Sequence, residues 1–471
     1  MLFNLCKNSV GICRTQYRPQ VLAAASVTLL TFCHGICLGW FAPMLAKLQS
    51  PNGSPLDFNA SVEEGSWLGA LICLGAIVGS AVFGQLLDII GRKGCIYGLA
   101  IPHICFWLLT YFAQSIEYLY AARFCAGMTG GGTYVVIPIF IGEIVDPIIR
   151  GRLTSLFTLA LNTGMLIGNI LSSHVPYHLI PMVVISLPLL YLLLETFFPE
   201  SPTYLLHKEQ EENAEKSFKF YYNYQALNKQ DVAQLNVKFS DLRNSVMEQK
   251  TQTEVVTWRD FFTKQAIRAF GLGIILMLMN VFTGSFALLN YMSSIFVVIQ
   301  TDIDPNTNTI IIGVVQIIGT VSAINLVDRY GRKFLLIISN ASMGICLAAF
   351  GMYAFFAEET SVDLSAYRSW LPLLIMTFII FACNIGIIPV TFVVLVEILP
   401  AKIRSKAMSI CLSFLSVCTF TLLKVFPSFM HTFGLSATMW ACATFAALAL
   451  FFISIFLPET KGKSMNSDNL K

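Results

Sequence analysis

The feature that most constrains this sequence is a series of long apolar runs, each about the length of one membrane-spanning helix. About 20 apolar residues in a helix cross the ~30 Å hydrocarbon core of a bilayer. Six runs precede a polar central stretch: Val21–Leu45, Ser66–Leu87, Gly94–Ala113, Glu117–Ile141, Leu153–His174 and Tyr177–Phe198. Six follow it: Ala266–Val298, Thr309–Val327, Phe334–Phe356, Trp370–Val396, Ala407–Met430 and Leu435–Leu457. The pattern predicts an all-α polytopic membrane protein.

Charged residues are too few to cover a water-facing surface. They make up 12% of the 471 residues, about half of the ~25% that is typical of soluble domains. The mean hydropathy is +0.69, so much of the apolar surface must face lipid. A net charge of +3 is too small and too dispersed to favour nucleic acid as a partner.

The positions of the cysteines favour a role in hydrophobic packing over disulfide bonding or metal binding. Most of the 13 cysteines lie inside the apolar runs, where Cys behaves as a small hydrophobe. None of their spacings suits zinc. The sequence also shows no nucleophile with an aligned base and no cofactor motif, so we expect no metal, no cofactor and no enzymatic activity.

The distribution of charge predicts the orientation. Lys and Arg gather in the short loops on one side, as at Arg92–Lys93 and Arg332–Lys333, while Asp and Glu dominate the other side. The positive-inside rule places the basic loops, the polar centre and both termini in the cytoplasm. The sequons at Asn52 and Asn59 then fall in the first outside loop. We therefore expect glycosylation there, and a plasma-membrane location.

Short motifs recur in the same order in the two sets of runs, which indicates a duplicated unit. Asp88-Ile-Ile-Gly-Arg-Lys returns as Asp328-Arg-Tyr-Gly-Arg-Lys, and the pair Glu143 and Arg150 returns at the same spacing as Glu397 and Arg404. Pro-Glu closes both sets. We predict a six-helix bundle over residues 1–198, a cytoplasmic linker with surface helices over 199–265, and a second bundle with a short tail over 266–471.

The repeated charges lie at the predicted cytoplasmic ends of the helices. Such Arg and Glu clusters could link the two bundles while the inner side is closed and separate when it opens. The alternative is that they only satisfy topology, although topology does not require carboxylates at matched positions. The predicted gating residues are Asp88, Arg92, Glu143, Arg150, Glu200, Asp328, Arg332, Glu397, Arg404 and Glu459.

These motifs resemble those of the sugar porter family of the major facilitator superfamily. Further similar segments are the glycine-rich stretch around Arg123, Pro199–Leu205 and Pro458–Lys463. Ser66–Gly69 and Cys418–Lys424 resemble the insect facilitated trehalose transporter-like branch. The resemblance implies the major facilitator fold, with 12 transmembrane helices in two pseudo-symmetric six-helix bundles, and a solute cavity near the membrane midplane.

The resemblance also implies which side chains face that cavity. They are Thr158, Asn162, Asn280, Phe286, Asn290, Gln316, Asn384 and Phe392. Several depart from the family pattern, since Phe286 stands at an asparagine position and Leu415–Ser416 replaces an Asn-Trp pair. Because a site built for hydroxyls needs matched amides, a less polar, non-sugar solute remains an alternative to a sugar.

The mode of transport is inferred from the intramembrane arginine. Arg123 matches an arginine that pairs with a first-helix aspartate in proton-coupled members of the family, but Cys37 occupies that aspartate position here. The resemblance therefore favours facilitated diffusion of a sugar-like small molecule by a monomer in the lipid bilayer. A non-transporting solute sensor is the other alternative.

Overall fold

The computed structural model describes residues 15–51, 53–226, 229–251, 258–359, 367–400 and 403–460. Every regular element in these ranges is a helix. The predicted all-α fold is confirmed. We refer to the described residues up to Phe198 as the N half and to those from Lys264 onward as the C half.

The N half contains α2 (Arg18–Gln49), α3 (Val62–Tyr111), α4 (Ile116–Ile144), α5 (Pro147–His174), α6 (Leu179–Val184) and α7 (Ser186–Glu195), after the short η1 (Thr15–Tyr17). The linker contains α8 (Pro202–His207), α9 (Glu211–Tyr221), η2 (Tyr224–Ala226), α10 (Lys229–Thr251) and η3 (Trp258–Phe262). The C half contains α11 (Lys264–Phe282), α12 (Ser285–Ile299), α13 (Pro305–Tyr330), α14 (Arg332–Glu359), α15 (Leu371–Ile385), α16 (Ile387–Ile398) and α17 (Arg404–Phe456).

Within the described ranges, nine helical segments are long and apolar enough to cross a bilayer. Two of them are about twice the required length, because α3 has 50 residues and α17 has 53. Each is divided by a non-helical glycine, Gly91 in α3 and Gly434 in α17. At 1.5 Å per residue each measures about 75–80 Å, which is enough to cross the membrane and return. With the shorter apolar stretch Leu179–Glu195, these segments are consistent with the twelve predicted spans.

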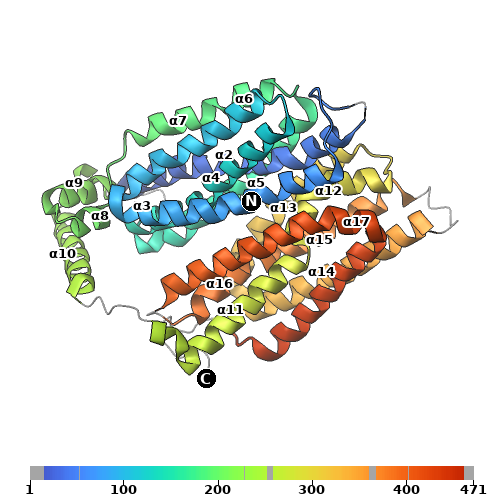
Figure 1. Ribbon diagram of the computed structural model, residues 1–471. Coiled ribbons are helices and arrows are strands. Elements are labelled where there is room, and N and C mark those ends of the chain that lie inside the picture. The colour runs from blue at the N-terminus through green and yellow to red at the C-terminus, as the bar shows by residue number, and fades with distance from the viewer. Residues whose placement is uncertain are drawn as a thin grey trace.

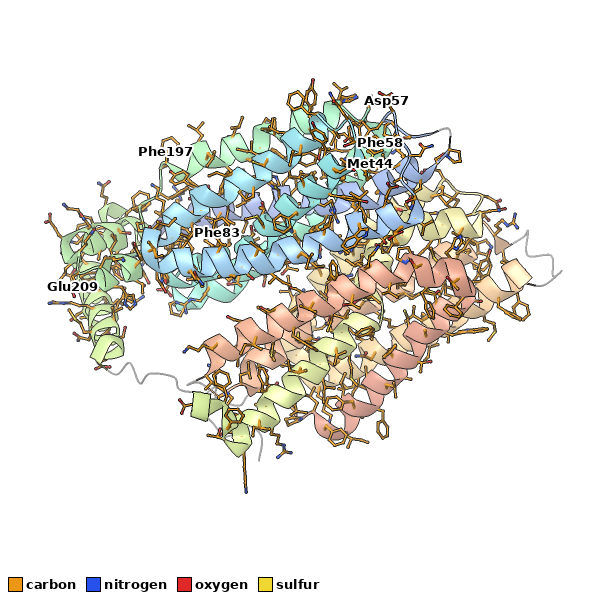
Figure 2. All side chains as sticks on the ribbon, viewed as in Figure 1. Met44, Asp57, Phe58, Phe83, Phe197 and Glu209 are labelled. Carbon is orange, nitrogen blue, oxygen red and sulfur yellow. The ribbon has the colours of Figure 1, made fainter. Side chains whose placement is uncertain are left out.

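The two halves lie side by side, with the linker helices at one end of the N half (Figure 1). Asp57 in the first loop and Glu209 in the linker lie at opposite ends of the molecule (Figure 2). The linker and the first loop therefore mark the two ends of the helices. We call the linker end the inner end and the Asp57 end the outer end.

The hydrophobic core is shared at the outer end and divided at the inner end. One large cluster joins Trp40 and Phe41 of the N half to Tyr291 and Phe296 of the C half. A second cluster, which reaches Tyr221 of the linker, contains no C-half residue. A third, from Ala266 to Leu457, contains no N-half residue. The halves are therefore packed together at their outer ends and packed separately at their inner ends.

Candidate functional site

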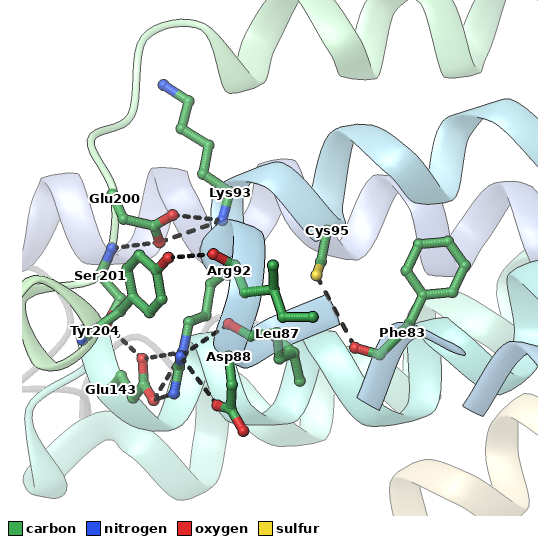
Figure 3. A network of polar contacts seen from close by, with 11 residues as sticks. Phe83, Leu87, Asp88, Arg92, Lys93, Cys95, Glu143, Glu200, Ser201 and Tyr204 are labelled. Carbon is green, nitrogen blue, oxygen red and sulfur yellow. Dashed lines mark hydrogen bonds and ion pairs between the residues drawn. The ribbon is translucent and has the colours of Figure 1, made fainter. Parts of the chain in front are cut away.

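The inner end of the N half carries an ion pair between the turn of α3 and the end of α4 (Figure 3). The Arg92 Nε donates to both carboxylate oxygens of Glu143, at 3.1 and 3.0 Å, and Nη2 donates to Oε1 at 2.7 Å. Ser201 also donates to this carboxylate, and the guanidinium lies 5.1 Å from the Tyr204 ring centre. Because both side chains are mostly buried, removal of either partner would leave a buried charge unpaired, which is costly.

Glu200 fixes the same turn by accepting backbone hydrogen bonds. Its carboxylate accepts the amide of Lys93 at 3.0 and 3.2 Å and the amide of Ser201 at 2.8 Å. Burial raises the pKa of Glu200, which these amides and the Arg92 charge partly oppose. Gly91 adopts φ 87°, and a Cβ there would overlap the Glu200 carboxylate. Glycine is required at this close approach.

The C half repeats this arrangement. Arg332 pairs with Glu397 at 3.2 Å, and Glu459 accepts the amides of Arg332 at 3.0 Å and of Lys333 at 3.1 Å. Gly331 adopts φ 93°, as Gly91 does in the first half. The predicted repeat is thus visible in the hydrogen bonds as well as in the sequence.

The remaining predicted gating residues occupy the edges of the two clusters. Arg150 and Arg404 each donate to the carbonyl five residues earlier in the chain, those of Val145 and Leu399, at 3.2 and 3.1 Å. Asp88 is exposed and lies 3.9 Å from Arg92. The side chain of Asp328 lies outside the described part of the structure. None of the contacts named here joins one half to the other, so a link between the halves through these residues stays a prediction.

Three buried polar side chains meet where α5 and α13 cross between the halves. The Asn162 amide donates to Thr320 Oγ1 at 2.6 Å, and the Gln316 amide donates to Asn162 Oδ1 at 3.1 Å. Asn384 of α15 packs against α13, because a Cβ on Gly319 would lie 3.0 Å from its Cβ. Two of the predicted binding residues therefore contact each other directly, and a third lies on a helix that packs against α13.

The other predicted binding residues lie in the C half or along α5. Asn280 is buried and donates to the Ile387 carbonyl at 2.8 Å, while its Oδ1 accepts no hydrogen bond from the described residues. Asn290 donates to Phe286 and Asn384 to Ile380, each one turn earlier in its own helix. Phe286, Phe392 and Thr158 are partly exposed.

Arg123 is fully buried in α4. Its Nε donates to the Leu68 carbonyl at 2.9 Å, and the guanidinium lies 4.1 Å from the Phe41 ring centre. Both terminal nitrogens lack a hydrogen-bond partner among the described residues. The Sγ of Cys37 lies 3.8 Å from His103 Nδ1. Within the described chain, Arg123 therefore forms no ion pair with an acidic side chain.

Comparisons with known proteins decide the family. Residues 24–469 match the model of the "Sugar (and other) transporter" family. The chain belongs to this family. It is 32% identical to the facilitated trehalose transporter Tret1 of Bombyx mori over 452 residues, which are 96% of this chain and 86% of that protein. It is 30% identical to the Polypedilum vanderplanki protein of the same name, over 95% and 86% of the two chains.

Among solved structures, this sugar transporter family member resembles the inward-open xylose transporter XylE of E. coli. The TM-score is 0.75 with 21% identity, covering 95% of this chain and 98% of the other. The match confirms the predicted major facilitator fold. Membership of a transporter family likewise agrees with the prediction that the chain is not an enzyme.

A polar contact that no sequence motif predicts joins the halves at their outer ends. Lys424 of α17 donates to Ser66 Oγ of α3 at 2.8 Å and lies 3.8 Å from Glu63. Its Nζ is also 4.4 Å from the Trp67 ring centre. The signal in the sequence was a lysine within an apolar run, but its partners are set by the packing of one half against the other.

Proposed function

We propose that this transporter carries trehalose, or a closely related sugar, down its concentration gradient. The proposal rests mainly on the similarity to facilitated trehalose transporters, which extends over nearly the whole chain. The buried group of Asn162, Gln316 and Thr320 supports it. Amide and hydroxyl groups of this kind can exchange their mutual hydrogen bonds for bonds to sugar hydroxyls.

Movement of the two halves would provide alternating access. The separate inner cores let the inner ends part as rigid units, while the shared outer core closes the outer side. In the opposite conformation the outer ends would separate and the inner ends would meet. We propose that the Arg92 and Arg332 clusters then face each other and contribute contacts between the halves, which is the gating role predicted from the sequence.

Uniport, rather than proton coupling, follows from the surroundings of Arg123. The proton-coupled members identified by resemblance cycle a proton on a carboxylate that pairs with the arginine. Cys37 stands where proton-coupled members have an acid, and Arg123 has no acidic partner in the described chain. We therefore propose flux that depends on the sugar gradient alone.

The test is uptake of radiolabelled trehalose, glucose and xylose by proteoliposomes that contain the full-length protein. The expected result is saturable trehalose entry that stops at equilibrium and is unchanged when a proton ionophore collapses the pH gradient. Accumulation above the outside concentration, or loss of uptake with the ionophore, would show proton coupling. Binding without flux would support the sensor alternative.

A less polar solute is the second candidate, and the amides of Asn290 and Asn384 favour it. Each amide donates to a carbonyl of its own helix, so fewer donors are left for a hydroxyl-rich ligand. Phe286 and Phe392, both partly exposed, would provide apolar contacts. Including cyclitols and small uncharged organic solutes in the same uptake panel distinguishes the two candidates.

We further propose that the inner end and both termini face the cytoplasm and that the protein acts as a monomer in the plasma membrane. Asn59 is exposed in the loop at the outer end, where an oligosaccharide could be attached. Asn52 lies outside the described residues. A mobility shift on glycosidase treatment that is lost in Asn59→Gln would support both the modification and the topology.

A further inference from the structure

Lys424 makes a polar contact between residues that are distant in sequence and belong to different halves. It projects from α17 toward the first turns of α3, where its ammonium group meets the Ser66 hydroxyl and the Trp67 ring. Ser66 is fully buried, and its hydroxyl donates a hydrogen bond to the Glu63 carbonyl at 2.6 Å. Both hydrogen-bonding functions of the hydroxyl are therefore satisfied only while Lys424 is in place.

Aromatic side chains around Lys424 pack at the same contact between α17 and α3. Phe420, one turn before Lys424, lies against Trp67 with ring centres 6.1 Å apart. Tyr291 of α12 donates to the Leu423 carbonyl at 2.6 Å and stacks on Phe426 at 5.8 Å. Its hydroxyl also reaches α3, because a Cβ on Gly69 would overlap it. This segment of α17 thus meets the N half through both polar and aromatic contacts.

We propose that Lys424, Ser66 and Trp67 form an outer latch that biases the transporter toward its inward-facing conformation. The proposal rests on alternating access, because opening the outer side must separate α17 from α3 and break these contacts. The contacts named above for the Arg92 and Arg332 clusters do not cross between the halves, whereas the latch does and is broken when the outer side opens. A ligand or contact shifts a two-state equilibrium only by the difference in its energy between the states.

The chemistry suits a latch that must open in every cycle. The Lys424 side chain is 24% exposed. When the halves separate at the outer end, water hydrates its ammonium group fully and offsets part of the lost contact energy. Glu63 is 79% exposed and adds little, because water screens the pair. The Ser66 hydrogen bond and the Trp67 cation–π contact remain as the main contributions. Their loss should shift the ratio of inward-facing to outward-facing molecules by about threefold to tenfold.

The experiment is hydrogen–deuterium exchange on the full-length protein in lipid nanodiscs, without solute. Lys424→Met removes the charge and the donor but retains an apolar stem of similar length. We expect faster exchange in the outer segments 62–70 and 420–430 and slower exchange in the inner segments 147–157 and 404–412. Lys424→Arg, which keeps a cation and a donor, should resemble the wild type.

Tyr177→Phe is the matched control, because it removes an outer hydrogen bond that lies within the N half, to Thr110 at 2.7 Å. It should leave the balance between outer and inner exchange unchanged. Unchanged exchange in Lys424→Met, or faster exchange at both ends, would overturn the latch, since the first shows no bias and the second shows general loosening. Hydrogen–deuterium exchange at the outer and inner segments does not require transport. A failure of the latch proposal is therefore distinguishable from a failure of the trehalose-uptake proposal.

Discussion

Gln316 of the C half donates a hydrogen bond of 3.1 Å to the amide oxygen of Asn162 in the N half. The two residues belong to α13 and α5, and both are buried. A side-chain bond across the junction of the halves must rearrange when the halves move. Its position is suited to solute binding because a bound hydroxyl can replace either partner.

The first prediction concerns this pair. Gln316→Leu leaves the Asn162 oxygen without its donor and removes one group for a sugar hydroxyl, so the half-saturation concentration for trehalose should rise about tenfold. Trehalose uptake into proteoliposomes that hold the protein in one orientation measures the half-saturation concentration. Asn325→Ala is the control, because Asn325 lies on the same helix, is exposed and, among the described residues, bonds to the Val321 carbonyl alone. Equal half-saturation concentrations in Gln316→Leu and the wild type would show that Gln316 does not bind the solute.

The second prediction compares the repeated ion pairs. Glu143→Gln should lower the free energy of unfolding by about 2 kcal/mol, because it leaves the mostly buried Arg92 charge without its carboxylate. Glu397→Gln should lower the free energy of unfolding by less. The Arg332–Glu397 pair is 3.2 Å apart, whereas the Arg92–Glu143 pair is 2.7 Å apart. Thermal unfolding in detergent measures both. A larger effect at Glu397 would contradict the ranking.

The inner clusters could be located from the sequence because they depend on local rules. A glycine turn followed by Arg-Lys, and a carboxylate at the end of the neighbouring helix, specify the contacts of Arg92 and Arg332. The duplication provides an internal check, since the second half repeats the pattern of the first. The all-α fold could also be predicted, because the apolar runs are a local feature of the sequence.

The contacts between the halves could not be located in this way. The partners of Lys424 depend on the angle at which α17 meets α3, which no local pattern encodes. The amides of Asn290 and Asn384 could not be assigned either, because each bonds within its own helix. The helix breaks at Gly284, with φ 86°, and at Gly386 divide apolar runs that the sequence predicts to be continuous.

The third prediction concerns the inner turn of the N half. Gly91→Ala should destabilise the protein by at least about 2 kcal/mol, because φ 87° and ψ 174° are strained for a residue with a Cβ and the methyl group would meet Glu200. Gly84→Ala is the control in the same helix, since a Cβ there meets no atom of the described residues within 4 Å. Thermal unfolding should show a large loss for the first and little change or a small gain for the second.

The fourth prediction concerns the docking of the linker on the N half. Asp146, almost fully buried at the start of α5, accepts hydrogen bonds from Lys238 of α10 at 2.7 Å and from Tyr222 at 3.3 Å. Burial alone would raise the pKa of Asp146, but the bonds from Lys238 and the Ile148 amide outweigh it and hold the pKa below its ordinary value. The charged carboxylate is therefore the form that stabilises the docked linker.

A pKa that is lower in the folded state gives stability that is present above the unfolded value, near pH 4, and is lost as the pH falls through the folded value. Asp146→Asn should therefore lower the unfolding temperature at pH 7, and the difference from wild type should shrink as the pH drops below about 4. It should also speed chymotrypsin cleavage within residues 229–251 at pH 7. Glu211→Gln is the control, because its pair with Arg243 joins two linker helices and is half exposed, so it should change both readouts less. A difference that grew on acidification would contradict the assigned charge state of Asp146.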